Sequence, residues 1–197
     1  GEAEVPTIFF GGGTPSLMPA SELSRVISRI RDRFELSSDA EITIEVNPDS
    51  VTREFLTQMR DAGANRISMG MQSAKPHVLQ VLDRTHKPEN VDVAVKNAQS
   101  AGFDHISVDL IYGVPTESIE DWKSSVETAL SLPIDHISAY ALIVERGTKL
   151  AAQISRGDVV MPADDETADK YLLADELFSK AGFNWYELSN WSKPGGQ

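Results

Sequence analysis

The sequence predicts an α/β fold in which parallel strands alternate with helices, as in all or part of a (β/α) barrel. Short β-prone runs alternate with amphipathic segments along the 197 residues. The dipeptide Ala-Gly ends three of these segments, at Gly63, Gly102 and Gly182, and marks βα units of about 30 to 40 residues. An open doubly wound sheet is the alternative, but no G-x-G-x-x-G follows the first strand.

In the first half of the chain, apolar residues at alternating or helical spacing define the elements. Ile42, Ile44 and Val46 alternate with polar residues and predict a strand that Pro48 stops. Thr52 is placed to cap the next helix. The expected order is strand 7–10, helix 21–34, strand 41–46, helix 52–62, strand 66–71, helix 75–82 and helix 90–100.

The second half continues the alternation. Ala181-Gly182 ends its longest helical pattern and precedes the last strand. The expected order is strand 105–111, helix 118–132, strand 136–143, a short excursion at 149–156, helix 164–180 and strand 185–188.

Composition limits the function classes. A net charge of −12 argues against general nucleic-acid binding. Neither a membrane-spanning apolar run nor a signal peptide is present, so we expect a cytoplasmic protein that is not integral to a membrane. The chain has no cysteine, and therefore no disulfide, thiolate nucleophile or cysteine-bound metal within it. It begins without methionine and ends in a loop-like stretch, from which we expect a fragment.

Polar residues follow the expected strands, and active sites of (β/α) barrels lie at the C-terminal ends of strands. Three glycines after the first strand expose backbone that a ligand can approach closely. The candidate residues are Gly11, Gly12, Gly13, Thr14, Glu45, Asn47, Gln72, Ser73, Arg84, Asp109, Tyr140 and Ile143.

Each candidate also has a plain structural interpretation. The glycines could form an ordinary strand-to-helix turn. Glu45 could be a solvated strand residue, Gln72 a polar cap of the sheet, and Arg84 a surface residue paired with Asp83. Asp109 is costly to bury in its apolar strand, which leaves a functional role and a structural hydrogen bond equally open. The four histidines lack metal-ligand spacing, and we expect His105 and His136, at strand starts, to be structural.

Together the candidates suit a zwitterionic ligand with hydroxyl groups. A carboxylate and backbone carbonyls can hold an ammonium group, and a guanidinium can hold a carboxylate. An amino-acid nucleoside fits this set, whereas a sugar phosphate fits less well because only one cation is placed. A barrel enzyme acting on a phosphorylated metabolite, with Asp109 or Glu45 as base, is the alternative.

Several motifs resemble the radical S-adenosylmethionine (SAM) proteins related to oxygen-independent coproporphyrinogen III oxidase. These motifs are FFGGGTPS (9–16), IEVNP (44–48), SMGMQS (68–73), LDRTH (82–86) and VDLIYGVP (108–115). Two later stretches are more similar to the branch of haem chaperones called HemW, namely SAYALIVERGT (138–148) and WYELSNW (185–191).

The resemblance implies a partial TIM-type barrel, with residues 1–197 forming part of one radical SAM core domain. It implies SAM and a [4Fe–4S] cluster as cofactors, and haem or porphyrin together with haem-acceptor proteins as partners. The family holds its cluster with a C-x-x-x-C-x-x-C loop, so we expect that N-terminal loop and a C-terminal region to lie outside this fragment. A haem chaperone is the expected function, and a coproporphyrinogen dehydrogenase that decarboxylates propionates is the alternative.

The same resemblance implies a role for each site residue but no catalytic residue in this chain. The SAM amino group is expected at Gly12, Gly13 and Thr14, with Glu45 near the methionyl part. The remaining expected contacts are the ribose at Gln72 and Asp109, the SAM carboxylate at Arg84, and the adenine side at Ile143.

Overall fold

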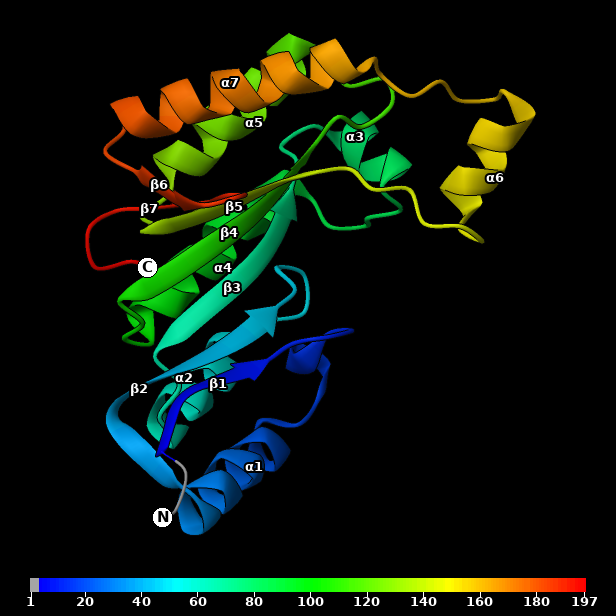
Figure 1. Cartoon of the computed structure of the whole chain (residues 1–197). Coiled ribbons are helices and arrows are strands. Elements are labelled where there is room, and N and C mark those ends of the chain that lie inside the picture. The colour runs from blue at the N-terminus through cyan, green and yellow to red at the C-terminus, as the bar shows by residue number, and fades with distance from the viewer. Residues whose placement is uncertain (1–3) are drawn as a thin grey trace. The chain divides into compact units, whose positions relative to one another are not determined.

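The computed structural model describes residues 4–197. In this range the strands are β1 Glu4–Phe10, β2 Glu35–Val46, β3 Arg66–Gln72, β4 His105–Tyr112, β5 His136–Ala141, β6 Asn184–Glu187 and β7 Asn190–Ser192 (Figure 1). The helices are α1 Ala20–Arg33, α2 Arg53–Ala62, α3 Pro76–Val81, α4 Pro88–Ser100, α5 Ile119–Ser131, α6 Lys149–Arg156 and α7 Asp164–Lys180, with a 3-10 helix η1 Pro15–Leu17. Every expected helix lies within about two residues of its expected bounds, which confirms the helical patterns.

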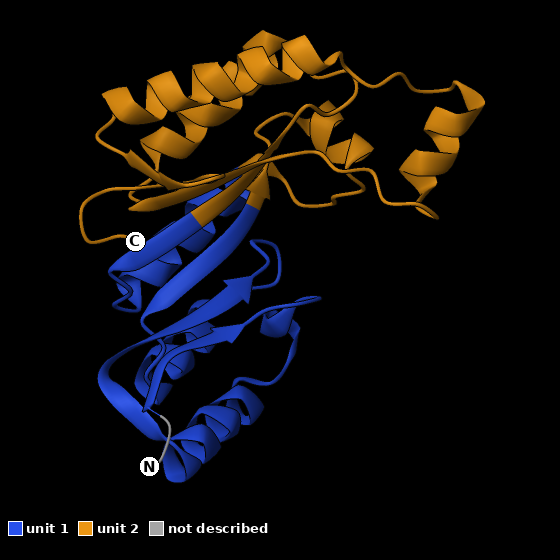
Figure 2. Cartoon of the chain, in the orientation of Figure 1, with its two compact units in different colours: residues 1–70, 89–107 blue, residues 71–88, 108–197 orange. Residues whose placement is uncertain are grey.

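The strands follow the order β1-β2-β3-β4-β5-β7-β6 in a seven-stranded sheet. β1 pairs in parallel with β2, and β2 in parallel with β3, as expected for strands joined through helices. The chain divides into two compact units (Figure 2). Unit 1 is Gly1–Gly70 with Glu89–Ser107, and unit 2 is Met71–Pro88 with Val108–Gln197.

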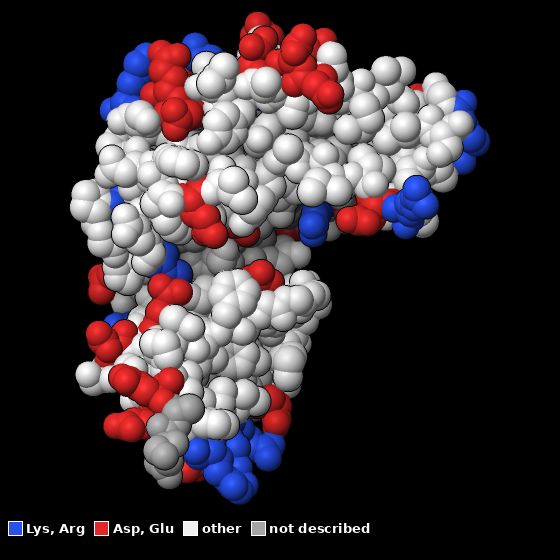
Figure 3. Space-filling model, viewed as in Figure 1, with Lys and Arg blue, Asp and Glu red and all other residues white. Residues whose placement is uncertain are grey.

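Unit 1 is organised on its parallel strands. Ile42, Ile44 and Val46 of β2 are buried, as the alternation predicts. Leu23 and Ile27 of α1 are buried as well, and α1 packs against α2. The apolar stripe of α1 therefore covers the strands. Arg31 and Arg33 lie in its last turn, and Figure 3 shows Lys and Arg side chains gathered at the lower end of unit 1, where Figure 1 draws α1.

The ends of α2 confirm the capping prediction. Thr52 Oγ1 accepts a hydrogen bond from Phe55 N–H at 3.1 Å. Gly63 ends the helix with a left-handed φ of 108°, a conformation that glycine adopts at little cost.

The start of β2 differs from the expectation of a strand at 41–46. β2 begins six residues earlier, at Glu35, and Leu36 pairs with Val5 of β1. The register shifts between Val5 and Thr7, where Pro6 cannot donate a backbone hydrogen bond. The added strand residues are mostly polar, so they lack the apolar alternation from which the strand was predicted.

Unit 2 has an aromatic core beneath α5 and α7, which pack together. Trp122, Phe178 and Trp191 are fully buried, and the rings of Phe178 and Trp191 lie 5.1 Å apart. Trp122 Nε1–H donates to the Lys170 carbonyl at 2.8 Å, and Trp191 Nε1–H to Asp175 Oδ1 at 2.8 Å. Both indoles therefore tie the core to α7.

The C-terminal strands depart from the parallel arrangement. A single strand was expected at 185–188, but β6 pairs antiparallel with β7, and β7 antiparallel with β5. Two residues, Leu188 and Ser189, connect β6 to β7, which is too short for a crossover and permits only a hairpin. No helix in the described range is long and apolar enough to cross a membrane.

Candidate functional site

The loop after β1 requires glycine for two different reasons, backbone conformation at Gly12 and Gly13 and lack of space at Gly11. Gly12 and Gly13 have φ of 85° and 63°, where a side chain is strained, and a Cβ on either would meet nothing within 4 Å in the described chain. At Gly11 a Cβ would instead collide with the Phe9 ring and come within 3.3 Å of Glu45 Cδ. The loop thus presents open backbone beside the carboxylate of Glu45.

Glu45 connects this loop to β2. Its Oε2 accepts a hydrogen bond from Gly12 N–H at 3.0 Å, and the residue is half-buried. The interpretation of Glu45 as a merely solvated strand residue is therefore wrong. Two predicted site residues from different strands are in direct contact within unit 1.

Ser16 is a residue of this loop that sequence reasoning missed. Its buried hydroxyl accepts a hydrogen bond from Asn47 N–H at 3.2 Å and lies 3.3 Å from Ser50 Oγ. Asn47 Oδ1 in turn accepts from Asp49 N–H at 2.9 Å. These bonds hold the turn after β2 against the loop after β1. Thr14 has no side-chain cap bond to η1 among the described residues.

In unit 2, Gln72 ends β3 in a strained turn. Its φ is 62°, and Ser73 N–H donates to the Met71 carbonyl at 2.8 Å across it, which is a γ-turn with a left-handed central residue. Gln72 is buried. The hydroxyl of Ser73 lies 3.0 Å from Ser125 Oγ of α5, which fixes the residue after the turn. Strain of this kind persists where the surroundings enforce it and often marks functional sites.

Arg84 follows α3 through a second left-handed turn. Asp83 has φ of 54°, and Arg84 N–H donates to the Leu79 carbonyl at 2.9 Å. The buried His86 ring donates through Nε2 to the Met71 carbonyl at 2.9 Å, which ties the turn to β3. The guanidinium of Arg84 is exposed and has no hydrogen bond or ion pair among residues 4–197, so the expected alternative of a pair with Asp83 is wrong.

Asp109, Tyr140 and Ile143 occupy different environments. Asp109 is half-buried in β4, and Tyr140 is about half exposed in β5. Ile143 was expected within a strand, but β5 ends at Ala141 and the Ile143 side chain is 78% exposed. Leu142 N–H, immediately before it, donates to the Tyr112 carbonyl at 2.8 Å, so this segment is still anchored to the end of β4.

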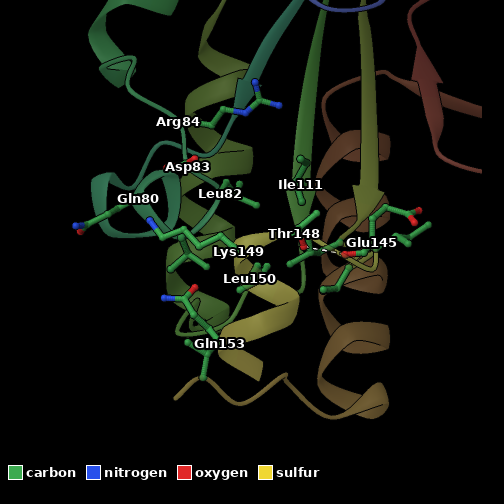
Figure 4. Close-up of a pocket in the computed structure, with 15 residues that line it drawn as sticks. Gln80, Leu82, Asp83, Arg84, Ile111, Glu145, Thr148, Lys149, Leu150 and Gln153 are labelled. Atoms are coloured by element: carbon green, nitrogen blue, oxygen red, sulfur yellow. Dashed lines mark hydrogen bonds between the residues drawn. The ribbon is translucent and has the colours of Figure 1, made fainter. Parts of the chain in front are cut away.

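A pocket in unit 2 brings Arg84 and Ile143 together. Its volume is about 670 Å³, and it is formed by the end of α3, Ile111 of β4, the segment after β5, and α6 (Figure 4). Pockets for small molecules and cofactors typically measure about 300–1,000 Å³. The volume therefore suits a small-molecule ligand.

A buried ion pair that no local sequence pattern indicates anchors the loop after β4. Lys170 Nζ of α7 donates to Glu117 Oε2 at 2.9 Å and to the Glu117 carbonyl at 2.7 Å. Gly113 N–H donates to the same Oε2 at 3.0 Å, and Oε1 has no partner among the described residues. Burial raises the pKa of Glu117, and the bonds from Lys170 and Gly113 oppose that shift only partly.

The histidine at the start of β5 behaves as a structural residue. His136 begins β5, is buried, and its Nε2 lies 2.8 Å from the Tyr186 hydroxyl. Over residues 4–197, no three His, Asp or Glu side chains are grouped so that they could hold a metal ion.

The polar groups of each unit are suited to bind one part of an amino-acid nucleoside. Unit 1 offers the Glu45 carboxylate and the bare backbone of the glycine loop, which can receive an ammonium group. Unit 2 offers the unpaired Arg84 guanidinium, which can bind a carboxylate through two parallel hydrogen bonds.

Comparison with known proteins agrees with these observations. Residues 1–129 match the model of the Radical SAM superfamily. The chain is 48% identical to heme chaperone HemW of Mycobacterium tuberculosis, over 98% of this chain and 50% of that protein. It is 37% identical to heme chaperone HemW of Lactococcus lactis, over 96% of this chain and 50% of the relative. The chain thus spans about half the length of these curated relatives.

A solved structure shows the same fold. Coproporphyrinogen III oxidase (HemN) from Escherichia coli, a radical SAM enzyme, superimposes with a TM-score of 0.85 at 26% identity, over 98% of this chain and 44% of that one. The expected partial (β/α) barrel is therefore confirmed, and the match disfavours the phosphometabolite alternative. On the superfamily match over residues 1–129, this chain belongs to the radical SAM superfamily.

Proposed function

We propose that this chain is the SAM-binding part of a haem chaperone that acts in the cytoplasm and delivers haem to acceptor proteins. The observation that carries the proposal is the 48% identity, over nearly the whole chain, with a protein named heme chaperone HemW. Residues 1–197 would form part of a single radical SAM core domain, in keeping with the family match and with relatives about twice as long.

Within this proposal, eight residues contact SAM. Gly12, Gly13 and Thr14 receive the amino group together with Glu45, whose carboxylate already accepts a hydrogen bond at the edge of the loop. Arg84 binds the SAM carboxylate, and its lack of a partner among the described residues supports this role. The remaining contacts are the ribose at Gln72 and Asp109 and the adenine side at Ile143.

The [4Fe–4S] cluster requires ligands that these 197 residues do not contain, since none of them is cysteine. We therefore place its thiolates in residues outside this chain. When bound, the cluster supplies one-electron chemistry and an open iron position for SAM. This chain contributes SAM binding and orientation.

A coproporphyrinogen dehydrogenase is the second candidate, and the superposition with HemN at a TM-score of 0.85 favours it. An experiment on the full-length protein reconstituted with its cluster distinguishes the two functions. Stoichiometric haem binding without turnover of coproporphyrinogen supports the chaperone. Formation of the vinyl product overturns it in favour of the dehydrogenase.

The SAM site is tested by Arg84→Ala in the same full-length protein. Loss of a charge-assisted bidentate contact should weaken SAM binding at least tenfold by calorimetry. Arg156→Ala is the matched control, because Arg156 is exposed, pairs with Asp158 at 2.8 Å and is not among the residues that line the pocket. Unchanged SAM affinity in Arg84→Ala would refute the role of Arg84.

A further inference from the structure

The unit 2 pocket has an aliphatic wall that is left bare. Apart from Ile143, which is assigned above to the adenine side of SAM, its apolar side chains come from the end of α3, β4, the segment after β5, and α6, and include Leu82, Ile111, Leu142 and Leu150. Leu82, Leu142 and Leu150 are only half-buried, and α6 has no buried residue. Covering aliphatic surface of this kind releases about 25 cal/mol per Å², so the wall favours a ligand with an apolar body.

Two cations from different elements border this wall. Arg84 follows α3, and Lys149 is the first residue of α6. Neither charged group has a hydrogen bond or ion pair within the described residues. Several other lysines do pair with a carboxylate, namely Lys96, Lys123, Lys170 and Lys180. Lys149 is thus available to an anion from outside the chain.

The acidic residues that line the pocket do not form an ion pair with Lys149. Asp83 and Glu145 also line the pocket. Figure 4 shows the Lys149 side chain extending toward Gln80, whereas Glu145 lies on the other side of the pocket and points away from it. The segment carrying Glu145 is fixed by Thr148 Oγ1, which donates to the Glu145 carbonyl at 2.8 Å. Lys149 can therefore meet a ligand carboxylate without displacing an internal pair.

We propose that Lys149 binds a carboxylate of the haem cargo, while the aliphatic wall covers an edge of the macrocycle. This inference rests on the proposed function, in which Arg84 is already engaged by the SAM carboxylate. The remaining cation at the pocket then serves a second ligand that combines an apolar body with an acidic group. Haem has this combination, because its aromatic macrocycle carries two propionate groups.

Lys149→Ala in the full-length, cluster-containing protein tests the assignment with three probes. Haem affinity, followed by its Soret absorbance, should fall roughly fivefold to tenfold through loss of one charge-assisted contact. Haem dimethyl ester, which has no free carboxylate, should bind the variant and the wild type equally. SAM affinity by calorimetry should stay within about twofold.

Two further variants control for charge and for folding. Lys149→Arg keeps the cation and should restore haem affinity. Lys123→Ala removes an exposed cation of α5 that pairs with Glu127 and does not line the pocket, so it should bind haem like the wild type. Equal thermal midpoints would show that all variants fold.

The outcomes separate this inference from the function on which it rests. A wild-type protein that binds no haem overturns the chaperone proposal itself. Haem binding that is unchanged in Lys149→Ala, or an equal loss for haem and its dimethyl ester, overturns only the role of Lys149. Loss of SAM affinity instead of haem affinity would assign the whole pocket to SAM and also overturn the inference.

Discussion

Gly12 and Gly157 share the same backbone conformation in different surroundings. Their φ angles are 85° and 78°, and a Cβ on either meets nothing within 4 Å in the described chain. Alanine therefore costs each site about 1–2 kcal/mol of backbone strain without a steric clash. Only Gly12 donates to the Glu45 carboxylate, whereas Gly157 ends α6. Comparing alanine substitutions at the two glycines therefore separates the effect of backbone strain on stability from the effect on ligand binding.

Gly12→Ala should lower the free energy of unfolding by about 1 kcal/mol and weaken SAM binding at least tenfold, because the loop must distort where SAM is proposed to bind. Gly157→Ala should lose similar stability in urea unfolding and keep its SAM affinity within about twofold. Calorimetry on the two full-length variants makes the comparison. Equal SAM affinities would contradict the role of the glycine loop.

Site residues that lie at the ends of predicted strands could be identified from the sequence. Residues whose role depends on a partner far away in the chain could not. Glu45 stood out because it lies at the C-terminal end of a predicted strand, and it does contact Gly12. His86 was known only as part of a motif, and its bond to Met71 depends on how a turn folds back. Glu117 and Lys170 lie 53 positions apart, so no local pattern relates them.

At the scale of elements, α7 fixes the loop after β4 through the buried Lys170 and Glu117. A Cβ on Gly113 would approach Thr167 of α7 to 3.3 Å, so the loop and the helix are closely packed. Leu142 beside the pocket donates to the Tyr112 carbonyl, at the start of the same loop. The packing of α7 therefore extends to the pocket wall.

Lys170→Met should cost about 3–5 kcal/mol of unfolding free energy, because it leaves the Glu117 carboxylate buried without its cation. Adding Glu117→Gln should restore part of that loss, since the buried charge is then removed. Lys180→Met, at an exposed pair on the same helix, should leave the free energy of unfolding nearly unchanged. Urea unfolding measures all three, and a double variant no more stable than the single one would argue against this account.

Helices and strands were predicted correctly where apolar residues recur at a clear spacing. The prediction failed where a strand is mostly polar or is set by a short connection. The bounds of α2 follow from its apolar face at Phe55, Leu56 and Met59 and from Gly63. The first half of β2 is held by pairing with β1 rather than by its own apolar alternation. β7 has three residues, too few to show a period, and it exists through antiparallel pairing with β5 and β6.

For the whole molecule, Glu117 gives stability a defined pH dependence. Its folded pKa lies above the ordinary value of 4.5 because the carboxyl is buried. Above pH 4.5 the folded protein therefore retains a proton that the unfolded chain has released, and this group's contribution to unfolding free energy falls as pH rises to the folded pKa.

Glu117→Gln should remove that contribution. Its stability relative to the wild type should increase as pH rises from about 4.5 to the folded pKa of Glu117, as measured by urea unfolding at each pH. Asp121→Asn serves as a control of opposite sign, because the pKa of Asp121 is lowered and its contribution is lost as pH falls. A pH-independent difference between wild type and Glu117→Gln would count against a raised pKa.

The aromatic core of unit 2 has a spectroscopic consequence. All three tryptophans of the chain, Trp122, Trp185 and Trp191, belong to unit 2. Two are fully buried and Trp185 is 54% exposed, so iodide should quench chiefly one emitter in the native state. Tryptophan emission follows the unfolding of unit 2 alone, whereas circular dichroism follows the helices of both units. Coincident transitions by the two signals would identify the units as one cooperative folding block, and separate transitions would resolve the stability of each.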